Sequence, residues 1–341
     1  MGKPWLDGEG TVHIPAFEVP LSSYMSPGAK ATFIEEANGD TARLTTEDLS
    51  VQEVRRLVDR HHLPLIDRAR QMYSVNVERK SIAGVTVDDI MPAGADSKSA
   101  HRVLINLHGG AFVTGSGAGG QLESIPIASI GNTRVVSVDY RLAPENGFPA
   151  ATEDVVAVYR ELLGSYHGSS IGIYGCSSGG LLAAEVVAAL HVQKLSAPGA
   201  VGIFCTGLDP IGGGDSSYLS TQLNVPFILP PPEEMRPRLT PPSPYFKIED
   251  CSNPLAFPLL SPAILEKFPS SLVITGTRDR FMSPAVFAHT QLVKNGVAAT
   301  LHVWEGMWHG FLYRPDMPEA VEAYRVIAGF FAKHLGRDSC D

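Results

Sequence analysis

The sequence contains little cysteine and no cluster of positive charge. Its four cysteines are scattered over 341 residues without C-x-x-C spacing, a pattern that favours reduced thiols over a disulfide framework or a zinc site. The formal net charge is −9, and no run of Lys or Arg interrupts this acidic balance. The negative net charge and the lack of a basic run both argue against a nucleic-acid surface. We therefore expect a cytoplasmic protein without a nucleic-acid partner.

Long apolar runs are also absent. The segment from Met1 to Asp7 has no apolar core of signal-peptide length, and the longest apolar helical pattern is interrupted by Glu185, so we expect neither export nor a membrane span. There is no internal repeat and no H-E-x-x-H, P-loop or EF-hand pattern, so we assign no metal or phosphate site. With 44% hydrophobic and 18% charged residues, the chain has the composition and length of a large globular domain with an accessory element.

From residue 103 onward, short and solidly apolar segments alternate with helical patterns, which is typical of a parallel sheet covered on both faces. An antiparallel pair over residues 75–83 and 85–91, turning near Gly84, is predicted to precede it. Six further strands are predicted at residues 103–107, 134–138, 170–174, 201–205, 272–276 and 300–304. Helices are predicted at residues 153–163, 179–194, 284–295 and 318–335, the third with Ser283 as its N-cap. The fold class is therefore α/β with a mostly parallel eight-stranded sheet.

Two segments lie outside this alternation. In residues 1–45 we find no reliable period; Ser50 and Glu53 then form a capping box for a helix, and Pro64 is predicted to start another. Residues 206–269 carry many prolines, including 230–232 and 241–242, and no strand–helix pair. Because so long a loop in a compact domain is usually a lid or a linker, we interpret it as an insertion over the site, with a surface excursion as the alternative.

A G-x-S-x-G motif marks the candidate nucleophile. Gly175-Cys176-Ser177-Ser178-Gly179 stands between a short β-rich run and a long helical pattern, the context of a nucleophile elbow. Such a turn strains the serine backbone, and side chains two positions either side would collide with it. Only Ser177 has glycine at both of those positions, so it is the predicted nucleophile.

A serine hydroxyl needs a base to take its proton, and the base needs an acid to orient it. Asp279 follows the penultimate predicted strand and His309 follows the last one. A parallel sheet would bring both beside Ser177. Glu305 is a rival acid because it is close in sequence to His309, but it would have to reach back along its own loop.

The negative oxygen of a tetrahedral intermediate needs hydrogen-bond donors. Gly109 and Gly110 follow the strand at 103–107, and glycine lets backbone N–H groups approach a ligand closely. We predict that these two N–H groups and that of Ser178 form the oxyanion hole, with His108 as an orienting residue.

Residues 115–120 match G-x-G-x-x-G, and Asp139 ends the next strand about twenty residues on, which imitates a dinucleotide fingerprint. The fingerprint glycines should begin at the strand end, yet residues 108–114 intervene. This spacing disfavours a dinucleotide oxidoreductase, which a titration with NADH would detect.

Taken together, the motifs at residues 108–112, 139–145, 148–150, 175–180 and 306–311 resemble the bacterial hormone-sensitive-lipase family of α/β-hydrolase esterases. The resemblance covers residues 75–335. It implies an α/β-hydrolase core at 75–205 and 270–341 and a cap made from 1–74 and the insertion 206–269. It also implies carboxylesterase activity on short- to medium-chain acyl esters, no cofactor, often a homodimer, and a supporting role for the segment 140–149.

The chain departs from the family pattern at three places, one of which is the proline-rich insertion 206–269, whose sequence lacks the pattern of the usual cap helices. Cys176 and Ser178 flank the serine where the family commonly has Asp or Thr and then Ala, and Ala111 replaces the third glycine of the oxyanion loop. Ala111 should keep its N–H donor while narrowing the floor of the pocket, and Cys176 should behave as a small apolar residue. Lactone, amide or carbamate hydrolysis and lipase activity remain alternatives of the same chemistry. A non-catalytic ligand-binding protein on this scaffold is the alternative of another class.

Overall fold

The computed structural model describes residues 2–38, 49–95, 101–223 and 243–336. Within these ranges one large sheet has the strand order β10-β9-β8-β7-β5-β6-β4-β3, in which all neighbours are parallel except β4, which pairs antiparallel with β3 and β6. The strands are β3 (Val75–Ile82), β4 (Val85–Pro92), β5 (Val103–Leu107), β6 (Arg134–Val138), β7 (Ile171–Cys176), β8 (Ala200–Phe204), β9 (Ser270–Arg278) and β10 (Ala299–Trp308). The predicted eight-stranded, mostly parallel sheet is therefore confirmed.

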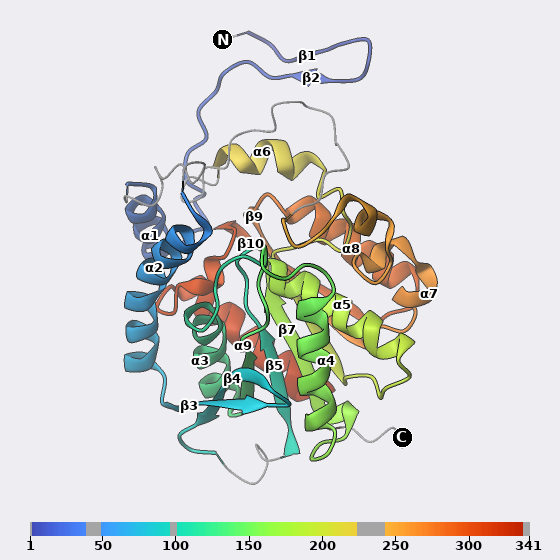
Figure 1. Cartoon of the computed structure of the whole chain (residues 1–341). Helices are drawn as coiled ribbons and strands as arrows, with labels where there is room; N and C mark the ends of the chain where they lie inside the picture. Colours follow the sequence, from blue (N-terminus) through green and yellow to red (C-terminus); the bar gives the residue numbers. More distant parts are fainter. Residues whose placement is uncertain (1, 39–48, 96–100, 224–242, 337–341) are drawn as a thin grey trace.

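Helices cover both faces of this sheet (Figure 1). One face carries α3 (Ala118–Gly131) and α9 (Pro318–His334), and the other carries α4 (Ala150–Leu162), α5 (Ser178–Val192) and α8 (Met282–Lys294). The four predicted helices are thus confirmed with small shifts of their ends. The N-cap prediction for α8 is wrong: the helix begins before Ser283, with Phe281 as its N-cap.

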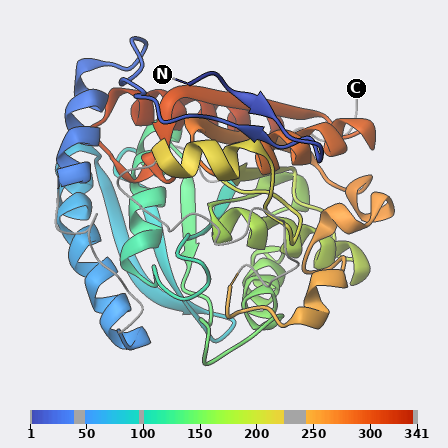
Figure 2. The ribbon, with the colours of Figure 1, turned by 90° about the horizontal axis from the view of Figure 1, so that it is seen from above.

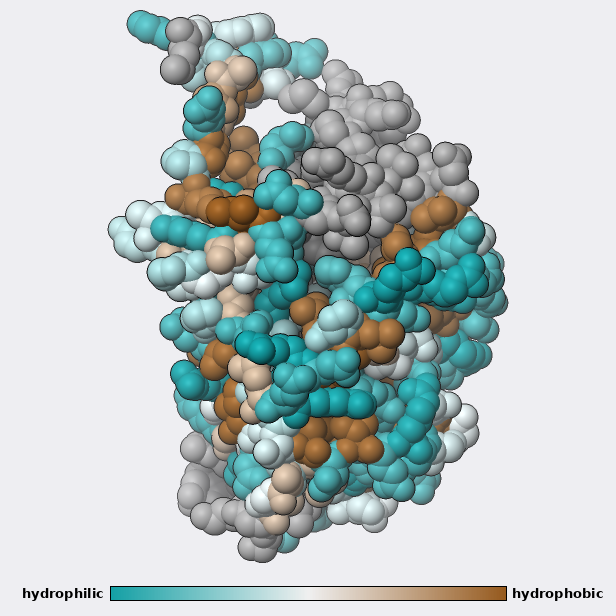
Figure 3. All heavy atoms as spheres, turned by 90° about the vertical axis from the view of Figure 1, so that its left-hand side faces the viewer, coloured by the Kyte–Doolittle hydropathy of each residue, from teal (hydrophilic) through white to brown (hydrophobic). Residues whose placement is uncertain are grey.

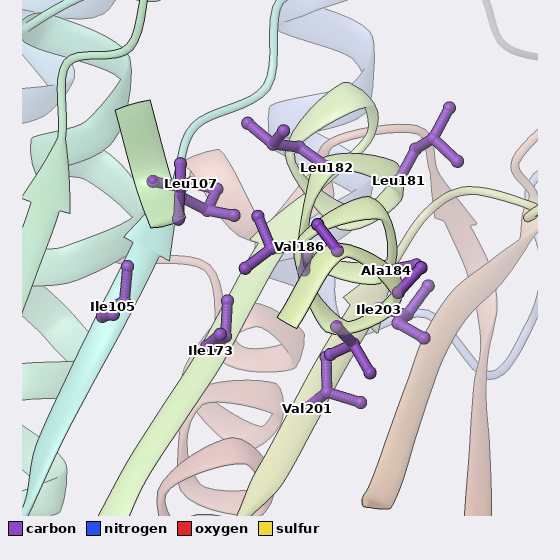
Figure 4. Packing of buried hydrophobic residues seen from close by; sticks show 14 of the residues in the cluster. Ile105, Leu107, Ile173, Leu181, Leu182, Ala184, Val186, Val201 and Ile203 are labelled. Atoms are coloured by element: carbon purple, nitrogen blue, oxygen red, sulfur yellow. The ribbon is translucent and has the colours of Figure 1, made fainter. Parts of the chain in front are cut away.

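Each face has its own apolar core because strand side chains alternate between the faces. In β5, Ile105 and Leu107 belong to the core under α5, whereas Leu104 belongs to the opposite core with α3 and α9. Figure 4 shows the first of these cores, in which side chains of β5, β7 and β8 pack against Leu182 and Val186 of α5. Burying a side chain of this size contributes roughly 1.5–3 kcal/mol, so the central strands are held firmly from both sides.

The N-terminal segment contains two helices, α1 (Pro27–Asn38) and α2 (Val51–Met72). The capping box is confirmed, since Ser50 Oγ accepts from the Glu53 N–H and the Glu53 carboxylate accepts from the Ser50 N–H. The prediction that Pro64 starts a new helix is wrong, because α2 continues through it. Packing outweighs the lost hydrogen bond: Ile66 and Ala69 are buried against the body. Ahead of the helices, β1 (Trp5–Leu6) and β2 (Val12–His13) form a separate hairpin.

The described part of the insertion contains short helices where the sequence predicted none. They are α6 (Asp215–Leu223), α7 (Pro262–Leu265) and the 3-10 turns Ile248–Ser252 and Pro258–Leu260. Pro258 and Pro262 each open one of them, because proline is well accommodated in a first helical turn. The prolines at 230–232 and 241–242 lie outside the described residues.

An apolar cavity of about 790 Å³ lies between the N-terminal segment, α1 and α6, with Phe17, Phe33 and Leu219 in its wall. Figure 2 shows α6 and the β1–β2 hairpin over the same end of the molecule. Figure 3 shows apolar side chains gathered on the adjoining face, below the hairpin.

Candidate active site

The predicted catalytic side chains stand directly after strand ends. Ser177 follows β7, Asp279 follows β9 and His309 follows β10. The strands β7, β8, β9 and β10 lie side by side in this order and are all parallel. Their carboxyl ends therefore lie at the same edge of the sheet, where ligands of open α/β folds bind.

The turn at Ser177 depends on its glycines. Ser177 has φ 56° and ψ −125°, a conformation that side-chain-bearing residues rarely adopt. A Cβ on Gly175 would lie 2.2 Å from the Leu107 carbonyl oxygen, and one on Gly179 would lie 1.9 Å from the same oxygen. The Ser177 N–H donates to the Phe204 carbonyl at 2.8 Å. The backbone is therefore held tightly enough to keep the hydroxyl at the exposed edge.

The structure brings the three predicted side chains together. His309 Nε2 lies 3.0 Å from Ser177 Oγ, and His309 Nδ1 lies 3.0 Å from Asp279 Oδ1. Asp279 is completely buried. The rival acid Glu305 is exposed on β10, and His309 Nδ1 is hydrogen-bonded to Asp279.

Asp279 is ionised in this setting. Burial alone would raise the pKa of its carboxyl, but the charge and hydrogen bond of His309, together with the N–H of Phe281, hold it below the ordinary value. Thr275 Oγ1 donates to the other carboxylate oxygen at 3.2 Å. An ionised Asp279 favours a proton on His309 Nδ1, which leaves Nε2 as the acceptor facing Ser177.

The oxyanion loop differs from its prediction in one residue. The Gly109 N–H donates to Glu123 Oε1 at 3.0 Å, so it points away from a substrate. No described residue accepts from the N–H of Gly110, Ala111 or Ser178. The loop continues in a left-handed conformation, with φ 116° at Gly110 and 54° at Ala111, so these two N–H groups are free to meet a substrate oxygen. The prediction for Gly109 is therefore corrected, and Ala111 takes its place among the candidate donors.

The segment after β6 supports this loop. The Tyr140 hydroxyl donates to the His108 carbonyl at 2.6 Å, and the Ala143 N–H donates to the Phe112 carbonyl at 2.8 Å. The buried His108 ring stacks on Tyr140, donates from Nδ1 to the Gly109 carbonyl, and has its pKa lowered by burial. Its neutral ring orients the loop, as predicted, and the supporting role implied for residues 140–149 is confirmed.

A buried carboxylate beneath the site escaped the sequence analysis. Glu123 of α3 accepts from Asn106 Nδ2 at 3.0 Å, the Gly109 N–H at 3.0 Å, the Cys176 N–H at 3.1 Å and the Tyr313 hydroxyl at 2.9 Å. Burial raises the pKa of Glu123 to about 7, against these hydrogen bonds. The only signal in the sequence was an acidic residue within the apolar run Leu122 to Ile127.

The G-x-G-x-x-G glycines serve packing. A Cβ on Gly115 would lie 2.4 Å from the Gly109 carbonyl oxygen, and one on Gly120 would lie 2.1 Å from Ser137 Oγ. Gly117 is the N-cap of α3. These glycines let α3 approach the sheet and the oxyanion loop, which explains them without a dinucleotide.

Among the described residues, one group of side chains has the proximity of metal ligands: Cys205, Asp279 and His309 offer atoms within 4.8 Å of one another. Two of the three belong to the candidate triad. A hydrogen bond with Cys176 and burial raise the pKa of the Cys205 thiol well above its usual value, which disfavours the thiolate that binds metals. The three described cysteines, Cys176, Cys205 and Cys251, are free, and Cys340 lies outside the described residues.

Comparison with known proteins identifies the class. A family model described as the α/β hydrolase fold matches residues 104–313, and the chain belongs to this family. A putative acetyl-hydrolase, LipR, of Mycobacterium tuberculosis is 29% identical over 78% of this chain and 83% of its own length, and an acetyl-hydrolase of Streptomyces hygroscopicus is 27% identical over 75% and 82%. Within the described ranges, no helix combines the length and apolar character that crossing a bilayer requires.

Solved structures narrow the class. Esterase E25 is 30% identical with a TM-score of 0.81, covering 95% of this chain and 99% of its own. An esterase from the bacterial hormone-sensitive-lipase family is 28% identical with a TM-score of 0.77, covering 91% and 99%. The predicted resemblance is confirmed: the protein is a carboxylic ester hydrolase related to the bacterial hormone-sensitive-lipase esterases.

Proposed function

We propose that Ser177, His309 and Asp279 are the catalytic triad of a serine carboxylesterase. The observation that carries the proposal is the unbroken hydrogen-bonded line from Ser177 Oγ through both ring nitrogens of His309 to Asp279, with 3.0 Å at each step. These distances lie within the range over which a base removes a nucleophile's proton.

In the reaction, His309 Nε2 takes the Ser177 proton as Oγ bonds to the ester carbonyl carbon. The carbonyl oxygen becomes negative and accepts from the N–H groups of Gly110, Ala111 and Ser178, each worth roughly 3–4 kcal/mol in the transition state. His309 then gives its proton to the departing alcohol oxygen, and the C–O bond to the alcohol breaks. A water molecule, deprotonated by His309, releases the acid from the acyl-enzyme.

The substrate we propose is a small-molecule ester with a short- to medium-chain acyl group. The acetyl-hydrolase names of two relatives support the short end of this range. Ala111 supports it as well, because its methyl group takes space beside the oxyanion where the family pattern has glycine.

A cap over the site, made from residues 1–74 and 206–269 on a core of 75–205 and 270–341, is part of the proposal. Contacts of the described residues support it. Arg55 of α2 donates to the Val113 carbonyl beside the oxyanion loop, and Ser220 of α6 donates to the Thr277 carbonyl near Asp279. Dimerisation and cytoplasmic location also belong to the proposal, and light scattering and cell fractionation test them.

The function is tested by the hydrolysis of p-nitrophenyl acetate, butyrate, octanoate and palmitate by the wild type, Ser177→Ala and Ser252→Ala. Ser252 is an exposed serine of the insertion, so its variant should keep wild-type rates. Ser177→Ala should lose turnover on every ester, and a fluorophosphonate should label Ser177 in the wild type. Unchanged rates in Ser177→Ala would rule out the assignment, and a maximum at palmitate would rule out the acyl range.

A further inference from the structure

Glu123 is a completely enclosed carboxylate that the proposed mechanism does not use. It lies on α3 with 3% of its surface exposed. Ionised carboxylates are rarely buried unless several donors compensate the lost hydration. Here both oxygens accept two hydrogen bonds each: Oε1 from Gly109 and Tyr313, and Oε2 from Asn106 and Cys176.

The four donors come from the separate segments that build the site. Asn106 lies at the end of β5 and Gly109 in the oxyanion loop, Cys176 directly precedes Ser177, and Tyr313 follows His309 by four residues. Three of these donors are amide N–H groups, which cannot accept a hydrogen bond. Only a group with two acceptor oxygens satisfies all of them, and a carboxylate is that group.

The contact with Gly109 decides how the oxyanion loop faces the substrate. The Gly109 N–H is bonded to Glu123, whereas the N–H groups of Gly110 and Ala111, in the left-handed stretch that follows, have no acceptor among the described residues and stay available to a substrate oxygen. The Cys176 N–H, on the same carboxylate, fixes the residue next to the nucleophile. A single carboxylate thus spans the two halves of the oxyanion hole.

We propose that Glu123 is a positioning residue of the esterase, whose ionised carboxylate holds the oxyanion loop, the nucleophile elbow and the loop after His309 in the register that the transition state requires. This inference rests on the proposed function. Displacement of an oxyanion donor by about 1 Å can cost on the order of 100-fold in rate, so positioning is enough to explain a large effect.

The charge state of Glu123 gives the inference a pH signature. Burial raises its pKa to about 7, so protonation near neutrality removes one acceptor from the network. The titratable groups around it are of three kinds. Burial raises the pKa values of Tyr140, Tyr174, Tyr313 and Tyr324. A hydrogen bond with Cys205 lowers the pKa of Cys176, but burial and nearby carboxylates outweigh it, and burial lowers the pKa values of His62 and His108, which pack beside α3. Each of them is neutral in this range, which leaves Glu123 as the group of the cluster that titrates.

The test compares Glu123→Gln with Glu185→Gln. Glutamine has one acceptor oxygen, so two of the four donors would face its NH₂ group. Glu185 is a matched control: it is also fully buried on a helix, and its partner is Thr152 of α4 rather than a loop of the site. Steady-state kinetics with p-nitrophenyl butyrate are measured from pH 5 to 9 and normalised to the folded fraction from circular dichroism.

We expect Glu123→Gln to lower kcat by roughly 10- to 100-fold with little change in KM, and Glu185→Gln to keep the kcat of the wild type. The acid limb of log kcat/KM should be steeper in the wild type than in Glu123→Gln, because the variant lacks the proton that Glu123 must lose before its carboxylate holds the four donors. A purely structural role would leave this slope unchanged.

Equal kcat values in the two variants, or the same slope of the acid limb in the wild type and Glu123→Gln, would overturn the inference. If Glu123→Gln does not fold, Tyr313→Phe removes a single donor to the carboxylate and decides in its place: an unchanged kcat overturns the inference and a lowered one supports it. Loss of turnover in Ser177→Ala of the same preparation establishes the proposed function separately. A wild type without that activity would refute both.

Discussion

At the scale of single residues, the site is governed by how closely backbone atoms approach one another. The Leu107 carbonyl oxygen touches the elbow from two directions, at Gly175 and at Gly179. This leaves no room for a Cβ at either position, and it fixes the left-handed conformation of Ser177 between them. The strained backbone of Ser177, the proposed nucleophile, is thus maintained by the packing around it.

The first prediction concerns Gly179→Ala. Its Cβ would lie 1.9 Å from a backbone oxygen that cannot move without shifting β5. Overpacking typically costs about 1–3 kcal/mol, and we expect the free energy of unfolding to fall by the upper end of this range or more. Urea denaturation monitored by circular dichroism measures it. The control is Gly329→Ala on α9, where no atom lies within 4 Å and alanine should stabilise by roughly 0.5–1 kcal/mol. Equal midpoints for the two variants would contradict this account.

The second prediction separates Asp279 from its rival. In Asp279→Asn the side chain keeps an acceptor for His309 but loses the charge that offsets the imidazolium, so kcat should fall roughly 10⁴-fold. Glu305→Gln should leave kcat nearly unchanged, because Glu305 is exposed. Measurement of kcat for p-nitrophenyl butyrate in both variants decides, and the reverse order of losses would assign the acid to Glu305.

Residue-scale prediction from the sequence works where chemistry restricts the residue type. Ser177, Asp279 and His309 could be proposed because each pairs a reactive side chain with a strand end, and the structure brings the three side chains together. Glu123 could not be found, because nothing in the spacing of an acidic residue in an apolar helix reveals which donors meet it. Whether Gly109 or Ala111 supplies an oxyanion donor depends on the Gly109 N–H, which donates to Glu123. The sequence could not reveal this choice, because it did not reveal Glu123.

At the scale of elements, packing decides where local propensity is weak. The central strands were predictable because burial on both faces makes them solidly apolar. Helix α1 was not, since only Ala29 and Phe33 of its twelve residues are buried. The wrong break at Pro64 has a similar origin: proline removes one hydrogen bond, while both halves of α2 are anchored to the body by Arg55 and Ile66.

The third prediction follows from that helix. Pro64 is exposed and inside α2, where proline costs up to about 3 kcal/mol relative to alanine. Pro64→Ala restores a backbone donor without altering a buried contact, so it should raise the free energy of unfolding by about 1–3 kcal/mol. The midpoint of urea unfolding should rise and the turnover should stay the same. A lower midpoint would mean that the proline relieves a strain of the helix as it bends over the body.

At the scale of the whole molecule, the two cores hold carboxyl groups of opposite behaviour. Burial raises the pKa of Glu123 to about 7 and that of Glu185 well above its ordinary value. Asp279 and Asp89 have lowered pKa values: burial opposes this, but the charge of His309 and the hydrogen bonds from Arg134 and Lys80, respectively, outweigh it. Glu123 and Glu185 therefore affect stability above their ordinary pKa values, whereas Asp279 and Asp89 affect it at lower pH.

The fourth prediction gives the sign of that profile. Between pH 4.5 and about 7 the folded protein keeps a proton on Glu123 that the unfolded chain has released, so stability falls as pH rises, by about 3 kcal/mol for this group. Glu185 extends the decline. Asp279 and Asp89 act in the other direction, since their contribution is lost as pH falls below the ordinary value of 3.8 toward their lowered pKa values. Burial lowers the pKa values of His61, His62 and His108, so their contribution to stability rises with pH up to their ordinary value of 6.5 and opposes this decline. The decline is therefore expected in the difference between the free energies of unfolding of the wild type and of Glu123→Gln, in which the histidine contributions cancel.

Urea unfolding of the wild type, Glu123→Gln and Glu185→Gln at pH 4 to 8 measures this difference, and Glu185→Gln should also lose part of the decline because Glu185 has a raised pKa as well. A difference between the wild type and Glu123→Gln that is flat or rises from pH 5 to 7 would contradict the assignment. Activity should run the opposite way over this range, because the proposed positioning role requires an ionised Glu123 carboxylate. The charge that orders the oxyanion loop is thus the charge whose burial lowers the contribution of Glu123 to the free energy of unfolding.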